Sequence, residues 1–178
     1  MAVPTSYATG TDRYPVLYLT DAQWQFGQTR TTVEFLARNG LIPEMIVVGV
    51  TNPDRVHDLY ATRADFRQGT RVIPLPTSGN GDQFLDFIAK EMIPWTERSY
   101  RTSGLRILAG HSAGGLFALH AMRVKPGMFQ ALIAASPWLA CYRKALELAE
   151  AQHDTTSAAA FRKHLDRLLA AQRKSPSH

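Results

Sequence analysis

The stretch Leu105–His120, LRILAGHSAGGLFALH, decides the fold, because it joins an apolar segment of strand length to an apolar, helix-favouring segment through one serine. Ile107–Ala109 are typical of a buried strand end, and Ala113–Met122 are typical of a helix. Between them, Gly110–Gly114 match G-x-S-x-G, a strand-to-helix turn so tight that the serine backbone is strained. The flanking glycines leave room for strand and helix to approach. The pattern predicts a nucleophile elbow that presents the hydroxyl of Ser112.

Outward from this stretch, apolar segments of strand length alternate with segments of helical periodicity. The predicted strands are Tyr14–Leu19, Met45–Val50, Arg106–Ala109 and Ala131–Ala135, and the predicted helices are Thr31–Asn39, Asp82–Trp95 and Ser112–Arg123. Strands and helices that alternate in this way form parallel sheets covered on both faces. The predicted fold class is therefore α/β, a parallel sheet flanked by helices.

The segments between these elements are expected to be loops. Asp21–Phe26 carry two aromatic side chains, Thr51–Leu59 are polar, and residues 60–81 hold prolines and glycines with little periodicity. A loop as long as the last one is often functional in a compact domain. Pro94 is expected to kink its helix or to begin the final turn.

The character of the chain changes after Trp138. Leu139–Gln152 and Ala158–Arg173 are typical of amphipathic helices, and no further strand is predicted. The expected organisation is an α/β-hydrolase core over residues 1–138 and a helical C-terminal segment over residues 139–178.

Composition excludes several classes of protein. The net charge of +5 is interspersed along helical patterns, which indicates a solvated face and no nucleic-acid partner, and no stretch approaches the ~20 apolar residues of a membrane span. The single cysteine, Cys141, excludes an internal disulfide and a cysteine-based metal cluster. The first ten residues lack the features of a signal peptide, so the default expectation is a cytoplasmic location unless a segment precedes Met1.

A serine nucleophile needs a base, an acid that orients the base, and an oxyanion hole. In such an elbow, one oxyanion donor is the backbone N–H after the serine, here Ala113, at the positive end of a helix. The second donor comes from the loop after an earlier strand. The candidates for it are Asp21, Ala22, Gln23 and Trp24. This chemistry needs no metal and no organic cofactor.

The base and acid should follow the serine in the chain. Acids after Pro137 are Asp154 and Asp166, and histidines are His153, His164 and His178. None of them follows a predicted strand. We take His153 and Asp154 as the candidate base and acid, although a solvated turn between two helices is the simpler interpretation of this pair.

Further polar and aromatic side chains are expected near the carboxyl ends of the strands, where ligands bind in such folds. Arg55, His57 and Asp58 follow the second strand, and an Arg55–Asp58 brace within the loop is the simplest interpretation. His111 is expected to pack behind the nucleophile. Trp138 follows the strand beside the elbow and is placed to favour an aryl or apolar substrate.

Taken together, these motifs resemble the esterase family of α/β-hydrolases that includes esterase D, enterochelin and ferulic-acid esterases and the mycolyltransferases. The matching segments, within about residues 12–138, are Tyr14–Asp21, Ile42–Val50, Asn52 with Arg55, Phe84–Leu85 to Ile93–Pro94, Tyr100–Arg101, Gly110–Ala118 and Ala135–Pro137. The resemblance implies a serine esterase or acyltransferase that acts on a small-molecule ester through an acyl-enzyme on Ser112. It also implies that Ala113 and the Asp21–Trp24 segment supply the oxyanion donors.

The resemblance implies an α/β-hydrolase-like parallel sheet flanked by helices, here shortened, because members of the family carry further strands before Tyr14 and after Trp138. The chain is therefore the central piece of a longer enzyme, or its helical tail replaces the lost half, or a second subunit supplies the missing groups. An incomplete sheet leaves apolar edges, so a homo-oligomer is expected. The rival hypothesis is a non-catalytic or impaired hydrolase-fold module that serves in binding or assembly.

Overall fold

The computed structural model describes residues 1–68 and 71–137, together with Ala159 and Arg162. The chain separates into two compact units, Met1–Ser136 and Pro137–His178, and all the elements named here belong to the first. In chain order they are a 3₁₀ turn at Thr5–Ala8, β1 (Tyr14–Leu19), α1 (Ala22–Arg38), β2 (Ile46–Gly49), α2 (Arg55–Leu59), β3 (Ala64–Gln68), β4 (Arg71–Leu75), α3 (Gly81–Phe87), a π-helical turn at Ile88–Met92, α4 (Ile93–Ser99), β5 (Thr102–His111), α5 (Ala113–Val124) and β6 (Ala131–Ala135).

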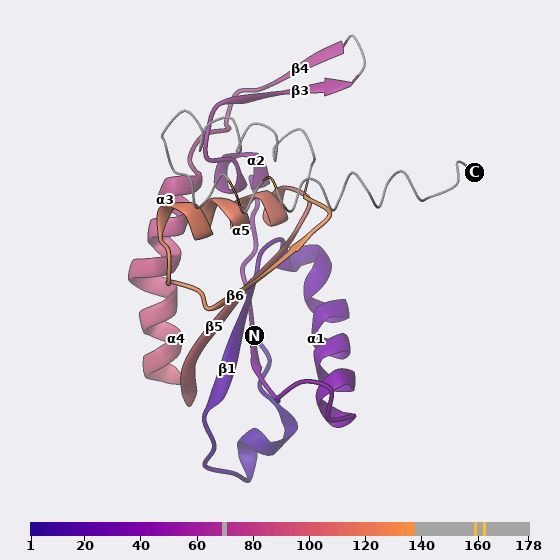
Figure 1. The fold of residues 1–178 in the computed structure, drawn as a ribbon, viewed down its shortest axis with the longest axis vertical. Coiled ribbons are helices and arrows are strands. Elements are labelled where there is room, and N and C mark those ends of the chain that lie inside the picture. The colour runs from indigo at the N-terminus through magenta and orange to yellow at the C-terminus, as the bar shows by residue number, and fades with distance from the viewer. Residues whose placement is uncertain (69–70, 138–158, 160–161, 163–178) are drawn as a thin grey trace, which may run out of the picture. The chain divides into compact units, whose positions relative to one another are not determined.

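Four of these strands form a parallel sheet in the order β2-β1-β5-β6 (Figure 1). Leu17 of β1 aligns with Val47 of β2 on one side and with Ile107 of β5 on the other, and Ile107 aligns with Ala131 of β6. Ala2 forms an antiparallel bridge with Val47 at the β2 edge. The predicted parallel sheet is confirmed, and β6 matches its predicted bounds.

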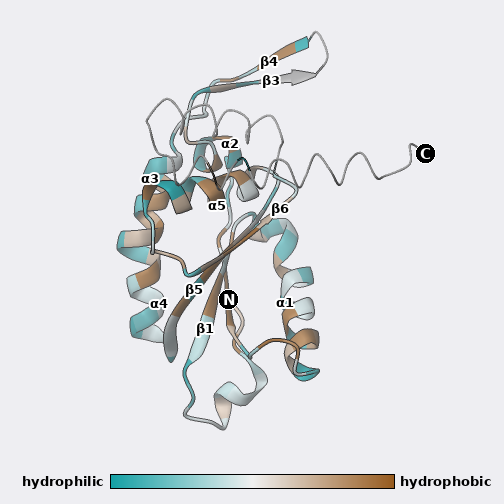
Figure 2. Cartoon of the chain, in the orientation of Figure 1, coloured by the Kyte–Doolittle hydropathy of each residue, from teal (hydrophilic) through white to brown (hydrophobic). Residues whose placement is uncertain are grey.

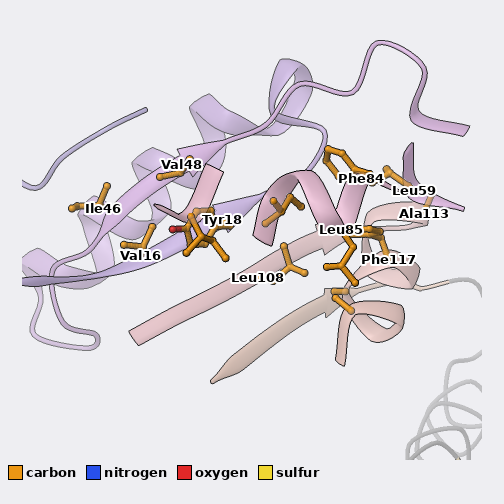
Figure 3. Close-up of a cluster of buried hydrophobic side chains, with 14 of the residues drawn as sticks. Val16, Tyr18, Ile46, Val48, Leu59, Phe84, Leu85, Leu108, Ala113 and Phe117 are labelled. Carbon is orange, nitrogen blue, oxygen red and sulfur yellow. The ribbon is translucent and has the colours of Figure 1, made fainter. Parts of the chain in front are cut away.

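The two faces of the sheet bury alternate residues, as pleated strands require. On one face, Val16, Tyr18 and Leu108 pack against Leu85 and Phe117 of the helices α3 and α5 (Figure 3). Burial raises the pKa of the Tyr18 hydroxyl to about 12. On the other face, a smaller cluster packs against α1, and it comprises Leu17, Leu19, Met45, Val47 and Ala109. Helices therefore cover both faces, as the alternation of elements predicted.

Helix α1 begins at Ala22, so the prediction of a loop over Asp21–Phe26 is wrong. The N–H of Ala22 donates to the carbonyl of Val50 at 2.9 Å, and the N–H groups of Trp24 and Gln25 donate to the carbonyl of Asp21. These bonds start the helix directly at the end of β1, nine residues earlier than its apolar periodicity indicates.

The polar loop after β2 also contains structure that periodicity did not predict. The side chain of Asp54 accepts a hydrogen bond from the N–H of His57 at 3.0 Å and caps the short helix α2. An Asp in this position is a frequent N-cap residue. The cap places Arg55, His57 and Asp58 on one short helix at the carboxyl end of the sheet.

The long loop expected over residues 60–81 is wrong in its centre, where β3 and β4 form an antiparallel hairpin. Ala64 aligns with Leu75, and Gln68 aligns with Arg71. Pro74 lies within β4, which is possible because a two-stranded hairpin has free edges that need no N–H at that position. The prolines that suggested a loop therefore do not exclude a strand here.

Pro94 interrupts its helix as predicted. It lies in the first turn of α4, directly after the π-helical turn Ile88–Met92. Proline has no N–H, and its ring collides with the carbonyl four residues earlier, at Lys90, so the regular hydrogen-bond ladder cannot continue through this point. The chain widens to a π turn and starts a new helix.

Strand β6 is apolar in sequence yet incompletely covered within the described part of the chain. Its residues carry the hydrophobic colour in Figure 2. Ile133, at its centre, is 52% exposed. The strand lies at one edge of the four-stranded sheet, so both its outer side and one face lack cover among the described elements.

Candidate active site

Ser112 lies between β5 and α5 in the strained conformation that the motif predicts. Its φ of 56° and ψ of −113° fall outside the regions that L-residues ordinarily adopt. Its N–H donates to the carbonyl of Ala135 in β6 at 2.9 Å, and its carbonyl accepts the N–H of Leu116 in α5 at 3.0 Å. Backbone bonds to a neighbouring strand and to the following helix therefore hold the serine, and within the described part of the chain its side chain makes no cap hydrogen bond to the turn.

The two glycines of the motif are required by close contact. A methyl group on Gly110 would lie 2.2 Å from the carbonyl carbon of Gly114. One on Gly114 would lie 2.2 Å from the hydroxyl oxygen of Thr20 and 3.6 Å from a carboxylate oxygen of Asp21. The first turn of α5 thus rests directly on the end of β5 and on the end of β1.

The N-terminus of α5 supplies an unused backbone donor. Ala113 is buried, and its N–H has no acceptor among the residues that the structure describes. The first N–H groups of a helix lack partners within the helix and carry its partial positive charge. The N–H of Ala113 is therefore suited to a developing oxyanion, as the motif predicts.

Among the four residues from Asp21 to Trp24, the structure leaves one backbone N–H as a candidate for the second oxyanion donor. The N–H of Asp21 donates to the side-chain oxygen of Asn52 at 3.0 Å, that of Ala22 donates to the carbonyl of Val50, and that of Trp24 donates to the carbonyl of Asp21. Only the N–H of Gln23 has no acceptor in the described part of the chain. Of the four candidates for the second donor, the geometry favours Gln23.

An ion pair with a buried carboxylate lies beside the elbow. Arg55 donates to both carboxylate oxygens of Asp21, from Nε at 3.2 Å and from Nη2 at 2.9 Å, and Asp21 is 0% exposed. The predicted Arg55–Asp58 brace is wrong, because the guanidinium reaches back to the end of β1. The hydrogen bond with Asp21 raises the pKa of Arg55 above its usual value. The exposed ring of Trp24 lies 5.7 Å from the guanidinium carbon.

Asp58 instead joins His57 to Asn52. One of its carboxylate oxygens lies 2.9 Å from Nδ1 of His57, and the other accepts a hydrogen bond from the side-chain amide of Asn52 at 2.9 Å. The His57 side chain is 43% exposed, and the Asp58 carboxylate orients its imidazole through this contact. Sequence reasoning found His57 and Asp58 but not the amide that connects them to β1.

The second histidine–carboxylate pair of the described residues joins two helices. Nε2 of His120 in α5 lies 2.7 Å from a carboxylate oxygen of Asp82 in α3. His120 is two turns along α5 from the serine, and its ring nitrogen is occupied by this contact. The pair ties α3 to α5 and does not serve the elbow.

His111 does not pack behind the nucleophile, and that expectation is wrong. The residue is exposed and aligns with Ala135 of β6, which is exposed as well. Its face of β5 is the one that α1 covers only in part. Trp138, His153 and Asp154 lie outside the described residues, as do Cys141, His164, Asp166 and His178, so the base and acid stay a prediction.

The described residues show no other site of this kind. They hold no group of three or more His, Cys, Asp or Glu side chains arranged to bind a metal ion. None of the helices among them is long and apolar enough to cross a membrane. A cavity between the N-terminal segment and α1, lined in part by Val3, Arg30 and Glu44, does not include Ser112.

Comparison with known proteins identifies related chains. A family model described as "Putative esterase" matches residues 1–176. The ferri-bacillibactin esterase BesA of Bacillus subtilis is 34% identical over 138 residues, which are 70% of this chain and 47% of that protein. A siderophore enterobactin esterase of Emericella nidulans is 38% identical over 122 residues, 65% of this chain and 40% of that one.

A solved structure agrees with these relatives. The crystal structure of an IroE-like serine hydrolase from Shewanella oneidensis superimposes with a TM-score of 0.68 at 36% identity, and the match covers 75% of this chain and 43% of that one. The α/β-hydrolase-like fold predicted from the sequence is thereby confirmed. The chain spans less than half the length of each of these relatives.

Proposed function

The chain belongs to the putative esterase family, and on that premise we propose that it carries the nucleophile of a serine carboxylic-ester hydrolase. The observation that supports this function most directly is Ser112, held by backbone bonds in a strained strand-to-helix turn at the N-terminus of α5. Such strain persists only where the surrounding structure enforces it, and it is concentrated at functional sites.

The proposed reaction follows from the groups at the elbow. The hydroxyl oxygen of Ser112 attacks the ester carbonyl carbon while a histidine accepts the hydroxyl proton. The N–H groups of Ala113 and Gln23 stabilise the negative charge that forms on the carbonyl oxygen. The intermediate then expels the alcohol, which takes the proton from the histidine, and water hydrolyses the acyl-enzyme by the same sequence of steps.

For the base, His153 with Asp154 stays the proposed pair. His57 with Asp58 is the alternative that a described contact favours, because Asp58 already orients the imidazole at 2.9 Å. The two assignments make opposite predictions for the same assay. If His153 is the base, His153→Ala loses activity and His57→Ala keeps it, and if His57 is the base, the reverse holds.

The names of the relatives indicate the class of ester. Those named above are esterases of ferri-bacillibactin and of enterobactin, and a third, from Aspergillus fumigatus, is a siderophore triacetylfusarinine C esterase that is 30% identical over 137 residues. We propose a siderophore ester as the substrate. The exposed ring of Trp24, at the carboxyl end of the sheet, suits a ligand with aromatic groups.

Hydrolysis by the purified chain tests the proposal. Enterobactin and p-nitrophenyl butyrate are incubated with the wild-type chain, with Ser112→Ala and with Ser103→Ala, an exposed serine on the same strand. We expect the wild-type chain and Ser103→Ala to turn over both esters and Ser112→Ala to turn over neither. Of His57→Ala and His153→Ala, the variant that removes the base should also lose turnover. Absence of turnover by the folded wild-type chain would favour the binding or assembly module.

We also propose that the chain forms a homo-oligomer. The edge strand β6 with its exposed Ile133 supports this, because an uncovered apolar edge strand is a surface for association. Light scattering coupled to size-exclusion chromatography gives the mass, and a monomer at all concentrations would contradict the proposal.

A further inference from the structure

The junction between β1 and α1, like the nucleophile elbow beside it, turns at a non-glycine residue with positive φ. Asp21, its pivot residue, has a φ of 54° and a ψ of 37°, the left-handed region that few residues other than glycine, asparagine and aspartate adopt. A methyl group on Gly114 would lie 3.6 Å from its carboxylate, so the two junctions are in contact. The strands are parallel, so both helices begin at the same edge of the sheet (Figure 1).

Five side chains hold this junction, and we call them the Asp21 network: Asp21, Gln23, Asn52, Arg55 and Asp58. Arg55 binds both carboxylate oxygens of Asp21. Asn52 accepts the N–H of Asp21 with its side-chain oxygen and donates to Asp58 with its side-chain nitrogen, which fixes the orientation of that amide. The network therefore connects the end of β1 to the loop after β2 and to α2.

Gln23 is held from the same side. Its side-chain nitrogen donates to the carbonyl of Asn52 at 3.3 Å, and its side-chain oxygen accepts the N–H of Asn52 at 3.2 Å. The residue whose backbone N–H is free is thus tied through both polar atoms of its side chain. The N–H groups before and after it in the chain are tied as well.

Stability alone does not account for a charge pair in this place. Removing a carboxylate and a guanidinium from water is costly, and apolar side chains of similar volume serve a fold at least as well. A hydrogen-bonded network built around the buried side chains of Asp21 and Asn52 does fix backbone positions, because each buried member has a single arrangement that satisfies its hydrogen bonds. Sharp placement is what an oxyanion donor requires.

We propose that Asp21, Asn52 and Arg55 are positioning residues for ester hydrolysis, which hold the N–H of Gln23 where the carbonyl oxygen gains negative charge. This inference rests on the proposed function. The three side chains act through Gln23 and contact no reacting atom. Their loss should lower kcat and leave KM almost unchanged, because a misplaced donor weakens binding of the transition state more than binding of the substrate.

The test compares two ion pairs whose arginines are similarly exposed, although the acid of the control pair, Glu97, is 31% exposed and Asp21 only 1%. Asp21→Asn keeps the shape of the side chain and its tolerance of left-handed φ, and it removes the charge that Arg55 binds. The matched control is Glu97→Gln, which changes the partner of Arg106 on β5, where the pair is 2.6 Å apart and the arginine side chain is 27% exposed against 31% for Arg55. Arg55→Lys is the second variant, since a lysine keeps the charge but not the two-pronged contact.

The readouts are kcat and KM for p-nitrophenyl butyrate and the melting temperature of each variant. We expect Asp21→Asn to lower kcat on the order of 10- to 100-fold with KM within about twofold, and Arg55→Lys to fall between it and the wild type. Glu97→Gln should keep kcat within about twofold, with a smaller loss of melting temperature because its ion pair is more exposed.

Wild-type kcat in folded Asp21→Asn, or an equal loss of kcat in Glu97→Gln, overturns the positioning role and leaves the proposed function intact. If Asp21→Asn does not fold, Arg55→Lys decides by the same comparison. A folded wild-type chain without turnover overturns the proposed function and this inference with it, and that result is seen before any variant is measured.

Discussion

The two neighbouring junctions of the sheet, β1 to α1 and β5 to α5, solve the same geometric problem by different means. Each places a non-glycine residue with a φ near +55°, Asp21 or Ser112, directly before a helix. Side chains hold the first junction together with the backbone bond from Ala22 to Val50, whereas backbone bonds hold the second and its glycines let strand and helix approach closely. The difference follows from what each must keep free: a nucleophile needs its own side chain unused, and a backbone donor can be fixed by every side chain around it.

The largest expected effect on stability comes from adding a side chain where β5 and α5 approach most closely. A methyl group in Gly110→Ala would lie 2.2 Å from backbone atoms of Gly114, which cannot rotate away. We expect the free energy of unfolding to fall by at least about 3 kcal/mol, measured by urea denaturation.

The control for this variant is Gly27→Ala in α1, where nothing lies within 4 Å of the added methyl group. It should raise the free energy of unfolding by about 0.5–1 kcal/mol, because alanine favours a helix more than glycine does. Wild-type stability in Gly110→Ala would contradict the close approach of β5 and α5.

Removing one side chain, that of Asn52, should destabilise the junction between β1 and α1. Asn52→Ala removes the acceptor of the Asp21 N–H, in a buried setting, and the donor to the partly exposed Asp58. We expect a loss of about 2 kcal/mol in the free energy of unfolding, the usual consequence of leaving buried polar groups without partners.

Asn39→Ala serves as the matched amide, because its side chain donates to the carbonyl of Phe35 at an exposed helix end. Its effect should stay within about 0.5 kcal/mol. Equal effects of the two substitutions in thermal denaturation would mean that the Asn52 amide does not hold the junction.

The smallest of the three expected effects is an increase in the free energy of unfolding. Glycine adopts positive φ without strain, so Ser112→Gly should release the strain of the elbow and raise the free energy of unfolding by about 1 kcal/mol. Ser103→Gly, on an exposed part of the same strand, should lower it instead. A destabilised Ser112→Gly would show that the serine side chain contributes to the fold.

The sequence predicted the second junction and missed the first for one physical reason. The elbow is held by close backbone approach, which leaves glycines at fixed spacing in the sequence. The start of α1 is held by long-range hydrogen bonds from Ala22 to Val50 and from Asp21 to Asn52, and these leave no local pattern. Gly27, a residue of low helix propensity, lies within the part of α1 that was missed, so local reasoning placed the helix start too late.

The site residues were predictable where a local sequence motif marks them and were missed where a long-range contact places them. Ser112 and Ala113 follow from the motif, and the candidate segment Asp21–Trp24 contains the free N–H of Gln23. The partner of Arg55 was missed, because Asp58 is near it in sequence while Asp21 is near it only once β1 and β2 pair. The hairpin over β3 and β4 was missed because its prolines lie where a free strand edge tolerates them.

The central claim is that Ser112 is an activated nucleophile, and covalent labelling tests it most directly. A fluorophosphonate probe forms an adduct with such a serine whatever the natural ester is. Intact-mass analysis should show one adduct on the wild-type chain and none on Ser112→Ala, with Ser103→Ala labelled as the wild type is. An unlabelled wild-type chain that is folded by circular dichroism, or an adduct that persists in Ser112→Ala, would contradict the account.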